Sequence, residues 1–164
     1  MPTEQHEQHE HHFLLQRVQP AMVGLIDGSL STLAPIFGIA FYTQKPHAAF
    51  IAGLATAIGA AISMAYSEGL SDTGELTGRG TPLTRGLITG GGTFIGGILH
   101  TLPFLIPSYH VAVVTAAIVV AFELVGLALM RWRFFDTSFA SSLLHFVVGG
   151  AVIAIVGALV GSAG

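Results

Sequence analysis

The stretch HAAFIAGLATAIGAAISMAYSEGL, residues 47–70, decides the fold of this chain. It runs for 24 residues and contains one residue that is charged at neutral pH, Glu68. A helix needs about 20 predominantly apolar residues to cross the hydrocarbon core of a bilayer. Residues 47–70 are therefore predicted to form a membrane-spanning helix.

Four further apolar stretches have the same character, so the chain is predicted to cross the membrane five times. They lie at roughly 19–42, 86–106, 109–130 and 139–162. Asp, Glu, Lys and Arg together make up only 9% of the 164 residues, against about 25% in a soluble domain. The mean hydropathy is +0.73. We expect an all-α integral membrane protein whose five transmembrane helices form one domain, residues 13–164.

The first twelve residues, MPTEQHEQHEHH, differ sharply from the rest. They are polar and are predicted to be a disordered, cytosolic tail when no metal is bound. Its histidines and glutamates favour loose metal capture, and an ordinary solvated tail is the alternative. No basic segment or small-residue cleavage site precedes the first span, so we expect that span to be retained.

The composition also excludes several classes of protein. The chain has no cysteine, which rules out disulfides and thiolate metal sites. A net charge of −3 gives no reason to expect a nucleic-acid partner. The sequence contains no HExxH and no paired ExxH motif. A membrane metalloenzyme is therefore the weakest alternative, and we predict neither an enzyme nor a resident cofactor.

The distribution of basic residues predicts the orientation. Five arginines fall on one side of the predicted spans, and the only lysine, Lys45, falls on the other. The arginines are Arg17, Arg79, Arg85, Arg131 and Arg133. Cytosolic loops carry the excess of basic residues. The N-terminus is therefore predicted in the cytosol and the C-terminus outside.

Three carboxylates lie inside the predicted spans, Asp27, Glu68 and Glu123, and no lysine or arginine lies in the spans with them. An ionised acid at this depth costs a few kcal/mol on insertion scales. It takes up a proton, faces water or meets a cation. This pattern favours the movement of a cation across the membrane.

The helix over 47–70 also carries a row of residues four apart: Thr56, Ala60, Met64, Glu68 and Asp72. Residues at this spacing are neighbours on a helix surface. The row leads from mid-membrane to the cytosolic loop, where a further acid follows at position 75. A carboxylate suits hard cations, and a thioether shifts preference toward softer transition metals. The predicted metal ligands are Asp27, Met64, Glu68, Glu123, Asp72 and Glu75.

Depth along the helices places five potential ligands in the cytosolic half, with His145 joining Asp27, Met64, Glu68 and Glu123. Other roles remain open for several of them. Asp27 is alternatively a protonated acid bonded to a backbone carbonyl, Met64 a packing residue, and Glu68 a solvated helix end. Glu123 is alternatively a structural partner of Arg131, Arg133 or His145. His100, in the outer half of its span, is either a packing histidine or part of an outward proton route.

Glycine and proline predict two local features. Pro35 is expected to kink the first span, because its ring displaces the hydrogen bond to the Ser31 carbonyl. Three GxxxG pairs allow close helix approach within a bundle or across a dimer. They are Gly86/Gly90, Gly92/Gly96 and Gly157/Gly161.

Two segments together resemble the vacuolar iron transporter family. They are GLIDGSLSTLAPIFGIA, residues 24–40, and IAGLATAIGAAISMAYSEGLS, residues 51–71. The resemblance implies a dimeric exporter of Fe²⁺ and Mn²⁺ that exchanges metal for protons. It also implies that the path aspartate is Asp27, the path methionine Met64 and a further acid Glu68.

The chain departs from the family pattern in two places. Thr56 stands where some members have a glutamate. The connection between the second and third spans is only about 15 residues long, where many members have a Glu-rich metal-collecting domain. The module is also similar to the transporter half of membrane-bound ferritins. On this comparison the His/Glu tail is a hypothetical minimal substitute for the collecting domain.

We therefore predict export of Fe²⁺ and/or Mn²⁺ from the cytosol by proton antiport, in a homodimer embedded in a bacterial inner membrane. The main alternative is a structural membrane subunit whose acids only hold helices together. A transporter for an organic solute is a further alternative, against which the small residues on the helix faces argue weakly.

Overall fold

The structure, a computed structural model, describes residues 2–163, and their side chains from residue 8 onward. This part of the chain is helical and contains no strand. The elements are α1 (Pro2–Phe13), the π-helical turn η1 (Leu14–Val18), α2 (Gln19–Ser31), α3 (Leu33–Thr43), α4 (Pro46–Ser71), α5 (Pro82–Leu99), the 3₁₀ turn η2 (Leu102–Leu105), α6 (Tyr109–Phe134) and α7 (Phe139–Ser162). The predicted all-α membrane fold is confirmed.

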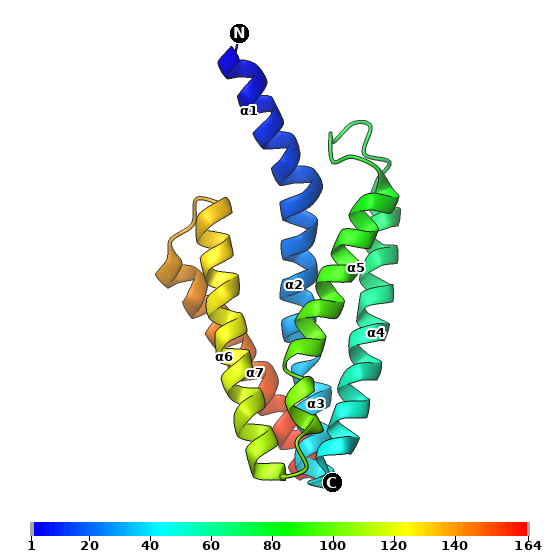
Figure 1. The fold of residues 1–164 in the computed structure, drawn as a ribbon, viewed down its shortest axis with the longest axis vertical. Helices are drawn as coiled ribbons and strands as arrows, with labels where there is room; N and C mark the ends of the chain where they lie inside the picture. The colour runs from blue at the N-terminus through cyan, green and yellow to red at the C-terminus, as the bar shows by residue number, and fades with distance from the viewer. Residues whose placement is uncertain (1, 164) are drawn as a thin grey trace.

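Five helical crossings match the five predicted spans: α2 with α3, α4, α5 with η2, α6, and α7 (Figure 1). Within the described residues, four helical stretches are long and apolar enough to cross a bilayer: Gln8–Thr43, Pro46–Ser71, Tyr109–Phe134 and Phe139–Ser162. The remaining crossing, α5, is 18 residues long and is not among these four stretches. Because α5 packs against both α2 and α4, much of its surface faces protein.

Residues 2–13 form helix α1, where the sequence predicted a disordered tail. The helix continues through η1 into α2, and Figure 1 shows it projecting beyond the other helices. Extending an existing helix needs no new nucleation, and glutamate and glutamine are good helix formers. These two effects explain why the segment is helical.

The first span is interrupted at Thr32, as Pro35 predicts. Helix α2 ends at Ser31, and α3 begins at Leu33. The next hydrogen bond runs from Ile36 N to Thr32 O at 3.1 Å, because Pro35 has no N–H to donate.

Glycines bring α5 close to both of its neighbours. A Cβ atom built at Gly86 or Gly90 would lie 2.6 or 2.7 Å from a backbone carbonyl oxygen of α4. At Gly92 or Gly96 it would lie 2.9 or 2.7 Å from a carbonyl oxygen of α2. Two GxxxG pairs on one helix thus serve two different interfaces within the chain. The third pair makes a similar approach between α7 and α3.

The two ends of the bundle differ in charge. The N-terminus, the connection between α4 and α5 and the connection between α6 and α7 lie at one end, and the C-terminus lies at the other (Figure 1). The five arginines belong to segments at the first end, while Lys45 lies between α3 and α4 at the second. The charge asymmetry predicted from sequence is therefore present in the fold.

Candidate functional site

The arginine-rich end of the bundle holds a buried ion-pair network around Glu68. Arg85 has no exposed surface, and its Nε lies 2.9 Å from Glu68 Oε1. Arg79 Nη2 lies 2.7 Å from the same oxygen. The expectation that no basic residue accompanies the intramembrane acids was therefore wrong for Glu68. Arg85 was assigned to a loop, but α5 begins at Pro82, so the residue lies in the first turn of that helix and points into the bundle.

The same arginine ties down the loop that follows α4. Arg85 Nη1 donates to Gly80 O at 3.0 Å, and Nη2 donates to Asp72 O at 3.1 Å. The Asp72 carboxylate is paired with Arg79 at 3.2 Å. Desolvation raises the pKa of Asp72, but hydrogen bonds from Gly74 N–H and the Thr77 hydroxyl, with the charges of Arg85 and Arg79, outweigh it, so the pKa lies below its ordinary value.

Two of the predicted metal ligands, Glu68 and Asp72, are thus neutralised by guanidinium groups in this structure. A third, Glu75, lies exposed in the same loop. Removing one member of a buried ion pair leaves an uncompensated charge, which costs about 3–5 kcal/mol. The network therefore holds α4, α5 and their connection together whether or not metal passes it.

Asp27 has a different environment. It lies half-buried on α2 and makes no hydrogen bond or ion pair within the described part of the chain, either to an arginine or to a backbone carbonyl. Its neighbours one turn away on the same face, Val23 and Ser31, are exposed. The glycines of α2, by contrast, face α5. Asp27 therefore projects from the side of α2 that one copy of the chain leaves open.

Met64 also lies outside the tightly packed face of α4. That face consists of small residues, Gly53 and Ala57 among them, which are buried. Met64 and Thr56 are half-buried. The Thr56 hydroxyl donates its hydrogen to Ala52 O at 2.8 Å. Its oxygen can still accept a hydrogen bond, but it is uncharged and does not replace the carboxylate of a glutamate.

The third intramembrane acid, Glu123, is paired with a residue that sequence reasoning had placed apart from it. Glu123 Oε2 lies 2.9 Å from His100 Nδ1, and the other imidazole nitrogen lies 2.7 Å from Thr32 Oγ1. The expected structural partners were Arg131, Arg133 and His145. The His145 imidazole instead hydrogen-bonds Ser141 O of its own helix at 2.6 Å and is exposed.

The five ligands expected in the cytosolic half are accordingly not gathered in one chain. Within residues 8–163, no group of three or more His, Asp or Glu side chains is arranged to hold a metal ion. Depth along a helix can be counted from sequence, but the direction in which each side chain points cannot. The contact between His100 and Glu123 was not predicted from the sequence. His100 is the C-cap residue of α5, and no rule of sequence spacing links it to Glu123, 23 residues later.

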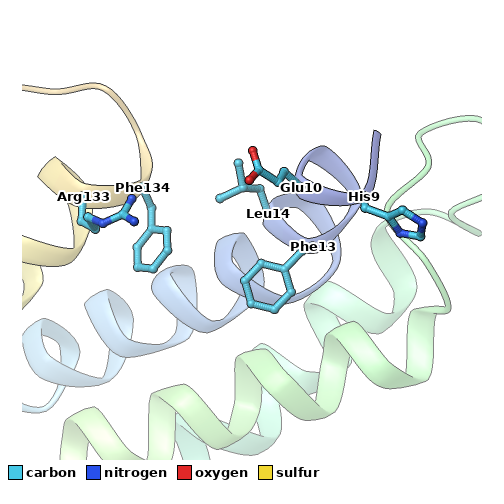
Figure 2. Close-up of a pocket in the computed structure, with 6 residues that line it drawn as sticks. All are labelled: His9, Glu10, Phe13, Leu14, Arg133 and Phe134. Atoms are coloured by element: carbon cyan, nitrogen blue, oxygen red, sulfur yellow. The ribbon is translucent and has the colours of Figure 1, made fainter. Parts of the chain in front are cut away.

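The tail contributes a pocket of its own. His9, Glu10, Phe13 and Leu14 line a cavity of about 370 Å³ together with Arg133 and Phe134 of α6. Figure 2 shows that the His9 ring and the Glu10 carboxylate leave the helix on different sides. These two residues therefore do not converge on one metal ion.

Membrane-spanning helices that carry acids at depth, one of them unpaired, define a polytopic α-helical membrane protein suited to ion movement. The family model described as VIT family matches residues 18–77, which include Asp27, Met64 and the Glu68–Asp72 segment. The match covers less than half of the chain, and over residues 18–77 it supports the resemblance to the vacuolar iron transporter family. The family's members are transporters, which supports membrane metal-ion transport as the general activity. Searches of curated proteins and of solved structures gave no match.

Proposed function

We propose that this protein exports divalent transition metal, Fe²⁺ and/or Mn²⁺, from the cytosol in exchange for protons. The observation that carries the proposal is Asp27. It is an acid within a span, inside the segment that matches the family, and no cation or donor of the described chain neutralises it. An acid in hydrocarbon needs a neutralising partner, and a passing metal ion or a proton supplies one.

Asp27 and Met64 are the proposed ligands within the membrane. One offers a carboxylate and the other a thioether, a combination that suits Fe²⁺ and Mn²⁺ better than Mg²⁺ or Ca²⁺. Both side chains lie on half-exposed faces of α2 and α4. Neither face is covered by another helix of the same chain to the extent that α5 is, which supports a site completed by a second copy.

A homodimer is therefore part of the proposal. In a monomer the open side of α2 would present Asp27 toward lipid, where a carboxylate is expensive. A second copy packed on the same faces would replace lipid with the partner's Asp27 and Met64. Isologous pairing of this kind brings identical residues together about a twofold axis.

We propose that the ionic network at the arginine-rich end is the cytosolic mouth. Glu68 and Asp72 carry two negative charges, and Arg79 and Arg85 carry two positive charges. The mouth is thus electrically balanced in this structure, and a metal ion that reaches Glu68 competes with guanidinium groups. Glu75, exposed in the same loop, is the acid available for first contact. This orientation puts the N-terminus in the cytosol and the C-terminus outside, in a bacterial inner membrane.

Flux through proteoliposomes tests the proposal. We expect the wild-type chain to move Fe²⁺ and Mn²⁺, but not Ca²⁺, with rates that respond to a pH gradient. Zn²⁺ belongs in the same series as a test of selectivity. Asp27→Asn should abolish this flux, because the amide binds neither a proton nor a cation as a carboxylate does, while the melting temperature stays near that of the wild type.

One alternative keeps a specific observation in its favour. The Glu68–Arg85 and His100–Glu123 pairs hold helices together, as the acids of a structural membrane subunit would. Such a subunit would give no metal uptake above empty vesicles. Wild-type flux from the Asp27→Asn variant would likewise contradict the role proposed for Asp27.

A further inference from the structure

Two cavities adjoin at the arginine-rich end of the bundle, where η1 and α2 lie beside the end of α6. One is the cavity of about 370 Å³ that the tail helps to line. The other, of about 390 Å³, lies between α2, α5 and α6. Phe13 and Phe134 line both, so the two cavities form one continuous groove, here called the α2–α6 groove. Each part has the size of a ligand pocket, which is about 300–1,000 Å³.

The part of the groove between α2, α5 and α6 has an apolar wall. Its lining comes from three helices and includes Met22, Ile88 and Met130. Apart from Arg17, all of the lining side chains in this part are apolar. Such a surface gains nothing from contact with water, whereas the acyl chain of a lipid matches it.

Two guanidinium groups lie at the edge of the groove. Arg17 of η1 lines one part, and Arg133, in the last turn of α6, lines the other. Both are exposed, and neither forms an ion pair or donates a hydrogen bond to another residue of the described chain. The Arg133 guanidinium lies over the Phe134 ring, 5.5 Å from its centre. This contact keeps a positive charge beside the groove.

The charge of the groove favours an anion. Among the described residues, the one acid that lines it is Glu10, in the part that Figure 2 shows. The two arginines therefore outnumber the acids of the described lining. Arg79 and Arg85, by contrast, are already paired with carboxylates of the chain. A ligand with a negatively charged group complements Arg17 and Arg133.

The groove also lies at the depth of lipid headgroups. Arg17 comes two residues before α2 begins, and Arg133 comes one residue before α6 ends. Trp132, beside Arg133, exposes 54% of its surface, and tryptophan is enriched where a membrane meets water. Basic pockets between helices on the cytosolic side of membrane proteins bind anionic headgroups.

We propose that the α2–α6 groove binds one molecule of an anionic phospholipid. Arg17 and Arg133 bind its phosphate, and an acyl chain lies along the apolar wall between α2 and α6. The lipid thereby joins the start of the first span to the end of the fourth, at the place where the tail leaves the bundle. This binding goes beyond metal transport and does not depend on it.

Native mass spectrometry of the purified full chain tests the proposal. The protein is freed of lipid and equilibrated in detergent micelles with equal amounts of phosphatidylglycerol and phosphatidylcholine that carry the same acyl chains. We expect one phosphatidylglycerol per chain to be retained in preference to phosphatidylcholine. Arg17→Gln combined with Arg133→Gln should lower this preference roughly 25-fold, since each arginine contributes roughly fivefold.

Lys45→Gln is the control, because it removes a basic residue at the other end of the bundle and should leave the preference unchanged. Equal retention of the two lipids by the wild type would overturn the proposal, and so would an unchanged preference in the double variant. If the double variant does not fold, Arg17→Gln and Arg133→Gln are measured singly, and each should lower the preference roughly fivefold.

A second variant distinguishes a phospholipid from a free phosphate. Ala21→Phe fills the apolar part of the groove and leaves both arginines in place, so we expect it to lose the bound phosphatidylglycerol while its melting temperature stays near that of the wild type. Glycerol phosphate at the concentration of the lipid should not displace phosphatidylglycerol from the wild-type chain. Displacement, or undiminished lipid binding by a folded Ala21→Phe protein, would show that the arginines bind an anion without its acyl chains, and the groove would not be a lipid site.

Discussion

At the scale of single residues, the three intramembrane acids differ in their partners, although each is a carboxyl group that is costly to ionise in a membrane. Glu68 is paired with two arginines, and Glu123 lies 2.9 Å from the imidazole of His100. Asp27 has neither kind of partner in the described chain. The differences follow from which neighbour each side chain reaches, and they distinguish an ion-pair network, a buried histidine–glutamate pair and an acid without a partner among the described residues.

Arg85 gives the sharpest prediction at this scale. Arg85→Met removes the buried guanidinium and leaves Glu68 with Arg79 alone, so the free energy of unfolding should fall by about 3 kcal/mol. The measurement is the melting temperature of the purified protein in detergent. Arg133→Met is the matched control, because Arg133 is exposed on α6 and its loss should change stability by less than about 0.5 kcal/mol. Equal melting temperatures for the two variants would show that the network does not stabilise the fold.

At the scale of elements, α5 is the helix that the others are arranged around. Glycines of this helix lie against the backbones of α2 and α4, and its threonines Thr89 and Thr93 are buried. Close approach through small residues replaces the hydrophobic effect as the force between helices in a membrane. The row of buried polar residues Arg85, Thr89 and Thr93 lies on the same helix, and only a protein-facing helix tolerates it.

Alanine substitutions at two glycines of α5 distinguish the effect of helix–helix packing on stability from the effect of helix propensity. Gly96→Ala would place a Cβ atom 2.7 Å from Leu25 O of α2, and the helices would have to move apart at a cost of about 1–3 kcal/mol. Gly91 has open space around it. Gly91→Ala should therefore be neutral or slightly stabilising, since alanine is the better helix former. Thermal unfolding of the two variants checks the difference. A Gly96→Ala protein as stable as Gly91→Ala would contradict the interface between α2 and α5.

At the scale of the whole molecule, the chain is a helical bundle (Figure 1), and its five arginines belong to segments at one end of it. Large apolar side chains such as Ile58, Ile62 and Val152 are exposed on the outer surface, as expected where lipid or a second copy takes the place of water. The two ends of the bundle differ in basic residues, and the arginines predict which end faces the cytosol.

The absence of cysteine makes this orientation directly measurable. A single cysteine at Thr77→Cys lies in the exposed α4–α5 connection, and one at Lys45→Cys lies between α3 and α4 at the other end. In intact bacterial cells treated with a membrane-impermeant thiol reagent, Lys45→Cys should be labelled and Thr77→Cys should not. Opening the cells should make Thr77→Cys reactive as well. The reverse pattern would invert the proposed direction of transport.

The sequence by itself determined the membrane class, the five crossings, the break before Pro35, the close approaches at the GxxxG pairs and the resemblance to a family over residues 18–77. Each of these depends on residue type and spacing along one helix, which sequence states directly. Only the tertiary structure decided the partners of the acids. Arg85 enters the bundle because α5 begins earlier than its hydropathy indicates, and His100 meets Glu123 because η2 turns the chain back into α6. Such contacts depend on the rotation of one helix against another, and rotation is set by packing among all of the helices together.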